Sequence, residues 1–369
     1  MFNPRLYYAS RLLFRFLLTS AAHVCTRGSI LSHHSNRFGG TLPPSIVNLS
    51  NHLTWLAFGR NMLSGSIPTG IENLINLQVF DLEYTFLNGS IPPNIGKLHN
   101  LVELYLTGDK LIGPIPSSIG NLSSLVELFM NDNELEGSIP PSLGRCQSLQ
   151  SLYLSHNSLS GIIPKEVLNL SSLSIFLALD HNSFNGPLPS EVGELVDLIA
   201  LDVSNNKLSG DIPNNLGKCI TMEYLNLEGN QVEGTIPPSL EGLKGLEALD
   251  LSSNNLCGPI PQFLSKFLSL KYLNLSHNNF EGKVPKGVFS NSTMISVLGN
   301  DNLCDGIPEL HLPPCAPNQT HSPNKFLAPK VLIPAVSTIT FIVILLSILF
   351  VCFVPKKSKN NASNFIFHQ

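Results

Sequence analysis

The chain has 369 residues, of which 13% are charged, about half the share found in an average soluble domain. Acidic residues outnumber basic ones by 26 to 22, and the formal net charge is −4. This balance excludes the strongly basic surface with which proteins bind nucleic acids, so we expect no nucleic-acid partner.

The first 38 residues differ in composition from the rest of the chain. They contain five arginines, and no acidic residue occurs before Glu72. The apolar stretch 12–18 is a poor secretory signal because Arg15 interrupts it. An arginine-rich, acid-poor sequence also suits an organelle transit peptide. We interpret residues 1–38 as an atypical N-terminal segment, either weakly signal-like or a misassigned start.

Residues 39–298 are built from an internal repeat. Gly, two residues and Pro recur eleven times at a spacing of 24 or 25, from Gly40-Thr-Leu-Pro43 to Gly282-Lys-Val-Pro285. In a typical unit, Leu152 and Leu154 alternate with Tyr153, which predicts a short strand with one buried face. One such strand buries its apolar face only against neighbouring coils, so we expect a single parallel sheet on the concave face. The period predicts a leucine-rich-repeat solenoid of about ten repeats with a mostly irregular or 3-10 convex side.

An asparagine follows the strand in most repeats and is expected to satisfy backbone groups of adjacent coils. The residues at this ladder position are Asn61, Asn133, Asn157, Asn182, Asn206, Asn230, Asn254 and Asn278. Thr85 and Asp109 replace it in the second and third coils. Because neither has a side-chain amide, the sequence predicts a local irregularity in these two coils.

Outward-facing strand residues form columns along such a sheet, and one column is aromatic. Repeat spacing aligns Asp81, Tyr105, Phe129 and Tyr153, with about 4.8 Å between successive strands. Acidic residues border this column, which suits an extended peptide carrying Lys or Arg. The ligand-binding candidates are Asp81, Glu83, Tyr84, Glu103, Tyr105, Glu127, Phe129, Asp132 and Tyr153. The alternative is that these are solvated strand residues without a ligand.

No group of residues predicts an enzyme, a cofactor or a metal site. His33 and His34 lack further ligands at metal-binding spacing. His156, His181 and His277 recur at one repeat position and are interpreted as surface residues. Asp202 and Asp250 have no second carboxylate fixed opposite them for acid–base work.

The C-terminal part predicts a membrane anchor. Residues 331–354 form 24 consecutive positions without a charge, enough for a transmembrane helix. Lys356, Lys357 and Lys359 follow, which predicts a cytosolic C-terminus for the tail 355–369. Residues 317–330 are a juxtamembrane linker. Sequons that precede the span and support secretion lie at Asn48, Asn88, Asn121, Asn169, Asn274, Asn291 and Asn318.

The repeat L-x-x-L-x-L-x-x-N-x-L-x-G-x-I-P resembles the plant-type leucine-rich repeat. The segment from Gly299 to Cys315 is similar to the closing cap, residues 299–316 here, of plant receptor-like kinases. The likeness is to the clade of the flagellin, elongation-factor Tu and rice blight-resistance receptors. It implies a cap disulfide between Cys304 and Cys315, whereas Cys146 and Cys219 lie about 14 Å apart and are expected to be buried small hydrophobes.

The same resemblance implies a function. It indicates a single-pass plasma-membrane receptor-like protein with an extracellular N-terminus that binds a peptide or protein ligand in plant defence and signals through a membrane co-receptor kinase. Candidates for contact with such a partner are Tyr272, Asn274, Ser276 and His277. The tail of 15 residues after the span is too short for kinase motifs, so we expect no enzyme. The alternatives are a truncated fragment of a serine/threonine receptor kinase and an inhibitor of a microbial wall-degrading enzyme.

Overall fold

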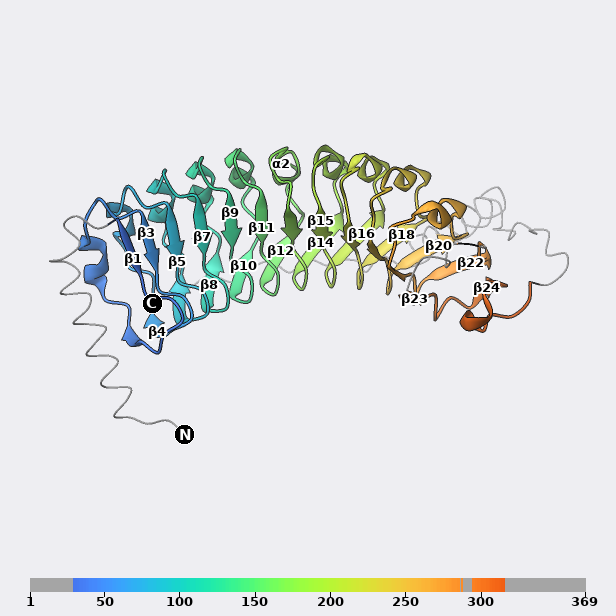
Figure 1. Cartoon of the computed structure of the whole chain (residues 1–369), viewed down its shortest axis with the longest axis horizontal. Coiled ribbons are helices and arrows are strands. Elements are labelled where there is room, and N and C mark those ends of the chain that lie inside the picture. The colour runs from blue at the N-terminus through green and yellow to red at the C-terminus, as the bar shows by residue number, and fades with distance from the viewer. Residues whose placement is uncertain (1–28, 286, 288–293, 316–369) are drawn as a thin grey trace, which may run out of the picture. The chain divides into compact units, whose positions relative to one another are not determined.

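The computed structural model describes residues 29–285, 287 and 294–315 (Figure 1). The chain divides into two compact units, 1–315 and 316–369, and all described residues belong to the first. The predicted linker 317–330, membrane helix 331–354 and tail 355–369 lie outside the described residues, as do Asn291 and Asn318. Among the described residues, no helix combines the length and apolar character needed to cross a bilayer.

The predicted parallel sheet is confirmed, and we call it the main sheet. Twelve strands pair in parallel, each with the strand of the next coil. They are β1 (Ile30–Ser32), β3 (Trp55–Ala57), β5 (Val79–Asp81), β7 (Glu103–Tyr105), β9 (Glu127–Phe129), β11 (Ser151–Tyr153), β13 (Phe176–Ala178), β15 (Ala200–Asp202), β17 (Tyr224–Asn226), β19 (Ala248–Asp250), β21 (Tyr272–Asn274) and β23 (Met294–Ser296). Strand β1 pairs with β3, so the array begins before residue 39, the boundary expected from the sequence.

A second parallel sheet, which the sequence did not predict, runs along the array beside the main sheet (Figure 1). Its twelve strands are β2 (Gly39–Thr41), β4 (Met62–Gly65), β6 (Phe86–Ser90), β8 (Lys110–Pro114), β10 (Glu134–Gly137), β12 (Ser158–Gly161), β14 (Ser183–Pro187), β16 (Lys207–Asp211), β18 (Gln231–Gly234), β20 (Asn255–Gly258), β22 (Asn279–Lys283) and β24 (Asn302–Cys304). The repeat Gly lies in these strands with a positive φ, as at Gly89 with 77°. A glycine with a positive φ is not predicted as part of a strand from sequence, yet the strands of neighbouring coils still pair on either side of it.

Short helical turns form the third side of each coil and follow the repeat proline. They are η1 (Pro44–Asn48), η2 (Ile71–Asn73), η3 (Pro93–Lys97), η4 (Ser117–Asn121), η5 (Pro141–Arg145), η6 (Ser190–Glu194), η7 (Asn214–Lys218), η8 (Pro238–Gly242), η9 (Gln262–Lys266) and, after the last coil, η10 (Pro308–Leu310). One coil has a four-residue α-helix instead, α2 (Lys165–Leu168). This agrees with the expected 3-10 character of this side, and Figure 1 shows these turns along one edge of the array.

Coils are joined by apolar packing and by the asparagine ladder. In most coils the inward strand residue and the apolar residue two positions further on, such as Leu152 and Leu154, are fully buried in one continuous core. Asn157 accepts a hydrogen bond at Oδ1 from the amide of Leu135 in the preceding coil (3.0 Å). Its Nδ2 donates to the carbonyls of Met130, Leu154 and Ser155 at 3.0–3.1 Å. One side chain therefore satisfies backbone groups of two coils.

The irregularity predicted at Thr85 and Asp109 is wrong, because these two residues complement each other. Strands β5 to β8 pair without interruption. The Thr85 hydroxyl donates to Asp109 Oδ1 (2.7 Å) and lies 3.2 Å from the carbonyl of Leu82. Asp109 Oδ1 also accepts from the amides of Thr85 and Leu87. Asp109 Oδ2 is buried without a hydrogen-bond partner among the described residues, and burial raises the pKa of this carboxyl to about 7.

Four of the described cysteines lie where the sequence predicted. Cys304 and Cys315 form a disulfide with a Cα–Cα distance of 4.9 Å. Cys146 and Cys219 are fully buried, and burial raises the pKa of each thiol to about 11. Cys257 is exposed and free.

Candidate functional site

In several coils, the residue at one outward position of the main sheet stabilises the turn that follows its strand. The side-chain oxygens of Asp81, Asp202 and Asp250 each accept a hydrogen bond from the amide two residues further on, at 2.9–3.0 Å. Asn226 and Asn274 do the same at 3.0 and 3.2 Å. This contact stabilises the turn that leaves the strand.

Asp81 is therefore not the exposed ligand contact that the sequence predicted. Only 8% of the residue is exposed, and Oδ1 is taken up by the amide of Glu83. Burial raises the pKa of Asp81, which is consistent with a carboxyl that lies inside the turn rather than in solvent. We remove it from the candidate surface.

Three consecutive coils have an aromatic residue at the position that the turn-stabilising Asp or Asn occupies in other coils. Register aligns Tyr105 with Phe129 and Phe129 with Tyr153, as the repeat spacing predicted. Their ring centroids lie 5.0 and 4.5 Å apart, and the ring of Phe176 continues the series at 4.8 Å from Tyr153. We call these four residues the aromatic row. All four are partly exposed on the outward face of the sheet.

Acidic residues border the aromatic row on one side. Glu103 and Glu127 are direct neighbours in the sheet, a pairing of like charges that costs stability when no cation lies between them. The Tyr105 hydroxyl donates a hydrogen bond to Glu127 Oε2. Burial, this hydrogen bond and the charge of Glu103 raise the pKa of Tyr105, so the phenol stays protonated as a donor. Burial, with a further effect of the charge of Glu127, likewise raises the pKa of Tyr153.

The remaining ligand candidates lie at the end of the strands, in turn positions. Tyr84 is 42% exposed, and the guanidinium of Arg60 lies 4.4 Å from its ring centroid. The same guanidinium pairs with Glu83 at 3.2 Å. Asp132 is exposed and accepts a hydrogen bond from Asn131 at 2.7 Å. The structure thus brings Glu103, Tyr105, Glu127, Phe129 and Tyr153 into one surface, while Glu83 and Tyr84 form a neighbouring group with Arg60.

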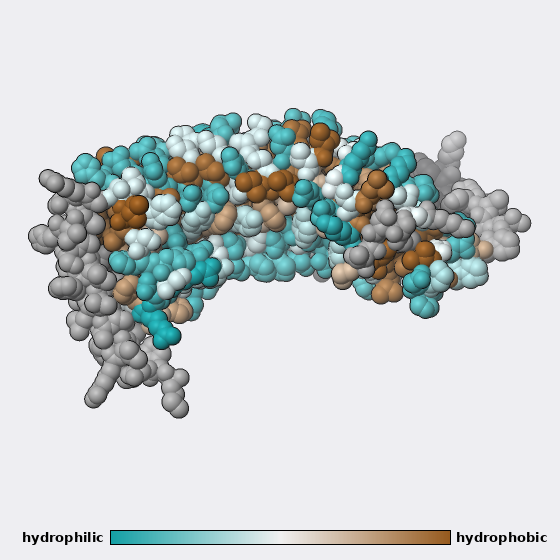
Figure 2. Space-filling model, viewed as in Figure 1, coloured by the Kyte–Doolittle hydropathy of each residue, from teal (hydrophilic) through white to brown (hydrophobic). Residues whose placement is uncertain are grey.

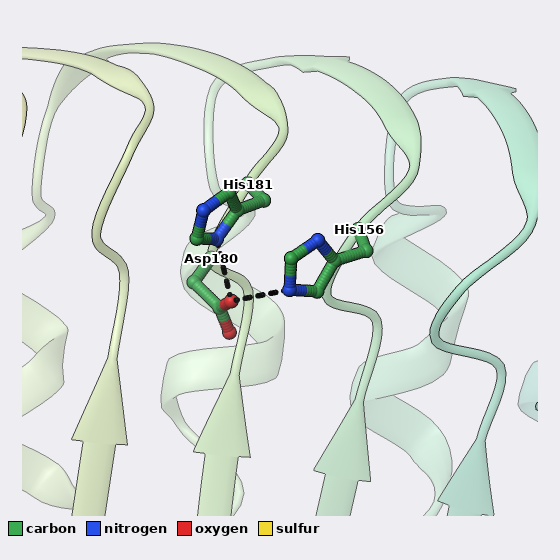
Figure 3. A group of neighbouring side chains, drawn as sticks. All are labelled: His156, Asp180 and His181. Carbon is green, nitrogen blue, oxygen red and sulfur yellow. Dashed lines mark hydrogen bonds and ion pairs between the residues drawn. The ribbon is translucent and has the colours of Figure 1, made fainter.

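A cluster that the sequence analysis missed lies beside this surface: His156, Asp180 and His181. Sequence analysis noted that the two histidines recur at one repeat position and interpreted them as surface residues. The signal was nevertheless present, because residues at one repeat position in consecutive coils are direct neighbours in the folded array. Figure 3 shows both imidazoles meeting the carboxylate of Asp180.

Among the partner candidates, exposure is uneven. His277 is exposed and Tyr272 is half-buried. Ser276 is buried, and its hydroxyl donates to Asn274 Oδ1 at 2.7 Å. The Tyr272 hydroxyl donates to Asp250 Oδ2 at 2.8 Å. The polar side-chain atoms of Asn274 and Ser276 are thus engaged within the sheet, whereas His277 is exposed and Tyr272 and Asn274 are each partly exposed to a partner.

We expect N-glycosylation at the exposed sequons of Asn48, Asn88, Asn121 and Asn169 but not at Asn274. Nδ2 of Asn274, the atom that would carry the glycan, donates to Asp250 Oδ2 and Ser252 Oγ at 3.0 Å. A glycan there would have to break this partly buried network, so correctly folded chains should lack it. Peptide mass spectrometry of the full chain from a plant secretory host checks this. Full occupancy of Asn274 in folded protein, or none at all four exposed sites, would contradict it.

Exposed apolar residues also occur elsewhere on the repeat array. Figure 2 shows hydrophobic groups distributed along the face turned to the viewer, separated by hydrophilic stretches. Large apolar residues with at least 40% exposure occur in many coils, among them Trp55, Phe86, Ile175 and Ile220. They are spread over different sides of the coils, whereas the aromatic row is a continuous series of rings on one face.

Comparison with known proteins identifies the family of the repeat. The Leucine Rich Repeat family matches residues 76–98, 124–146, 148–170, 197–219, 221–243, 245–267 and 269–291. The LRR receptor-like serine/threonine-protein kinase EFR of Arabidopsis thaliana is 51% identical over 59 residues, which are 16% of this chain and 6% of EFR. The receptor kinase-like protein Xa21 of Oryza sativa subsp. japonica is 46% identical over 54 residues, 15% of this chain and 5% of Xa21. The matches thus span a small part of either relative's length.

Solved structures of plant receptors are similar over most of the chain. The structure of a TDR receptor has a TM-score of 0.74 and 34% identity, covering 79% of this chain and 51% of that one. The Arabidopsis receptor kinase HAESA, solved with the peptide hormone IDA and the co-receptor SERK1, has a TM-score of 0.69 and 34% identity over 77% of this chain and 48% of its own. The repeat array is therefore similar to the leucine-rich-repeat part of plant receptors.

Proposed function

We propose that this chain, which belongs to the leucine-rich-repeat proteins and has homologues among the plant receptor kinases, binds an extended, basic peptide outside the cell. The peptide would bind on the outward face of β7 to β13. The aromatic row carries this proposal. In three successive coils, a partly exposed aromatic residue replaces the turn-stabilising Asp or Asn. The centroids of neighbouring rings lie 4.5 and 5.0 Å apart. Exposed aromatic side chains in a continuous series are typical anchors for a partner.

Charge supports a basic ligand. Glu103 and Glu127 lie side by side along the aromatic row, and their mutual repulsion would be relieved by a lysine or arginine side chain placed between them. Because the Tyr105 hydroxyl already donates to Glu127, a second donor on the ligand would use the remaining carboxylate oxygens. An acidic peptide would meet repulsion at the same place.

The length of the aromatic row sets the length of the recognised segment. From β7 to β13 there are three steps between neighbouring strands, roughly 14 Å at 4.7–4.9 Å per step. An extended peptide advances about 3.3–3.6 Å per residue, so about four residues cover the row. Including the acidic and aromatic group at Glu83 and Tyr84 adds one coil, which gives a segment of about five to six residues.

A receptor-type role would place this face outside the plasma membrane, with residues 331–354 as the anchor and signalling through a membrane co-receptor kinase. The HAESA complex with a peptide hormone and SERK1 supports this arrangement by analogy. Plant defence is the process suggested by the resemblance of the repeat and the cap to the clade of the flagellin, elongation-factor Tu and rice blight-resistance receptors. In this chain, the candidates with surface exposed to such a partner are His277 and, in part, Tyr272 and Asn274.

Replacing Glu103 and Glu127 together by Gln is expected to weaken binding of basic peptides by about ten-fold or more, because the shape of the side chains is kept and their charge is removed.

Replacing Tyr153 by Ala should reduce the binding free energy by about 2 kcal/mol, or the affinity about 30-fold, because a central aromatic anchor is lost. Fluorescence anisotropy with a library of labelled hexapeptides, each with one Lys or Arg and one apolar residue, measures both effects on the full chain.

The matched control is Glu247→Gln, which removes an exposed carboxylate that pairs with Lys271 at 2.6 Å, far along the array from the aromatic row. It should leave peptide affinity unchanged. Equal binding of acidic and basic hexapeptides, or full affinity in the Glu103 and Glu127 double variant, would reject the proposed surface.

A further inference from the structure

Two imidazoles and one carboxylate converge at the ends of β11 and β13, beside the aromatic row (Figure 3). His181 Nδ1 lies 3.0 Å and His156 Nε2 lies 3.7 Å from Asp180 Oδ2. The rings are stacked, with centroids 4.1 Å apart and planes inclined by 16°. The three ligand atoms all lie within 4.8 Å of one another.

We propose that His156, Asp180 and His181 bind a divalent transition metal ion, with Zn²⁺ as the preferred probe. Zinc bonds to histidine nitrogen and carboxylate oxygen are about 2.0–2.2 Å long, so neighbouring ligand atoms of a tetrahedral site lie roughly 3.3 Å apart. The two nitrogen–oxygen distances, 3.0 and 3.7 Å, bracket that value. Two imidazoles and a carboxylate with open positions are a ligand set that suits Zn²⁺ and related ions rather than Ca²⁺ or Mg²⁺.

The backbone holds these ligands in place before any ion arrives. His156 and His181 occupy the same repeat position with nearly equal φ values of 51° and 50°. Their amides donate to the carbonyls of Asp180 and Ser204 at 3.0 Å, so each turn is tied to the next coil. Both side chains therefore leave equivalent backbone positions in neighbouring coils. To direct both nitrogens at one ion, the two rings would have to rotate out of their stacked arrangement.

The carboxylate is oriented by a neighbour, as is usual at metal sites. The Ser155 hydroxyl donates to Asp180 Oδ1, which leaves Oδ2 directed to the imidazoles. The side chain of Asp180 is 14% exposed, whereas those of His156 and His181 are 50% and 48% exposed. The ion would thus be fixed from the protein side and open to water, or to a further ligand, on the other side.

A second group with metal-binding residue types, His34, Asp81 and Glu83, does not carry the same inference. It contains a single histidine, and the guanidinium of Arg60 already pairs with Glu83 at 3.2 Å. A metal ion would have to displace or repel this cation. Asp81 is moreover committed to the amide of Glu83.

Equilibrium dialysis of the full chain, prepared without a polyhistidine tag, against low-micromolar ZnCl₂ tests the proposal. We expect a single zinc ion whose affinity falls at least ten-fold in His156→Asn and in His181→Asn. Asn suits this position, because native Asn205 occupies it with a φ of 51°. Zinc should also raise the thermal unfolding midpoint of the wild type, and this shift should disappear in both variants.

The matched control is His277→Asn, which removes an exposed histidine at the same repeat position with a φ of 54°. It should leave zinc affinity unchanged, whereas Asp180→Asn should lower it. Zinc binding that survives both His156→Asn and His181→Asn, or that His277→Asn weakens equally, would overturn the proposal. The absence of bound zinc would reduce the cluster to an ordinary contact between imidazoles and a carboxylate. Peptide binding is measured separately, so either proposal can fail alone.

Discussion

Replacing Asp109 by Asn is expected to stabilise the repeat array, and to do so much more at pH 8 than at pH 4. Asn occupies this ladder position in most coils and donates from Nδ2 to backbone carbonyls, as Asn133 does to Leu106 at 2.7 Å. Asp109 has no such donor when ionised, and its Oδ2 is buried without a partner among the described residues. An Asn would restore the donor while its Oδ1 keeps the bonds from Thr85 and Leu87.

The pH dependence follows from the direction of the pKa shift. Burial raises the pKa of Asp109 from 3.8 to about 7, so between these values the folded chain binds a proton that the unfolded chain has lost. Stability is therefore retained below about pH 4 and lost as the pH rises to 7. The three-unit shift corresponds to about 4 kcal/mol, which is the order of magnitude of the charge-dependent part of the gain in Asp109→Asn at pH 8.

Urea unfolding from pH 4 to 8 measures this effect as the difference between variant and wild type, which cancels the titration of every other group. Asp132→Asn is the control, because Asp132 is an exposed carboxyl one coil further on and should change little at any pH. A gain in Asp109→Asn that is the same at pH 4 and pH 8 would show that the buried charge is not its cause.

Replacing Gly217 by Ala is expected to destabilise the array by about 3 kcal/mol, at the upper end of the cost of overpacking. Gly217 lies in the helical turn η7, where a Cβ would lie well inside contact distance of the backbone carbonyl of Ser239 in the next coil. Backbone atoms on both sides cannot yield as a flexible side chain can. The two coils would have to separate locally, with loss of core packing between them.

The comparison with Gly245→Ala isolates this cause. A Cβ at Gly245 would meet nothing closer than the Met222 carbonyl at 3.8 Å, and its φ lies outside the left-handed region. Gly245→Ala should therefore be neutral or stabilise by up to about 1 kcal/mol, since it restricts the unfolded chain. Thermal unfolding of both variants decides the matter. Equal effects of the two substitutions would mean that close approach between coils is not what requires glycine at Gly217.

The repeat alone predicted much of this molecule because one period fixes the register of the whole sheet. The alignment of Tyr105, Phe129 and Tyr153 follows from counting residues, and the structure reproduces it. The fold class and the position of the buried leucines follow in the same way. Such predictions succeed because neighbouring coils are nearly identical in length.

The parts that the sequence could not predict depend on how neighbouring side chains satisfy one another. The sequence predicts Asp81 as an exposed acid, yet its Oδ1 accepts a hydrogen bond from the amide of Glu83. Thr85 and Asp109 each depart from the repeat, and only their mutual hydrogen bond shows why the two departures occur together. The second sheet passes through glycines with positive φ, which local propensity assigns to turns.

The asparagine ladder has a consequence for how such a molecule can change. Its bonds between coils join residues 22 to 28 positions apart, so each coil is secured only to those beside it. A duplication or deletion of one whole unit, about 24 residues, would leave every other junction intact. It would lengthen or shorten the main sheet by about 4.8 Å, which is the length of about one and a half residues of an extended peptide. The length of the repeat array could thus evolve in steps of one coil, with the same core packing in every unit.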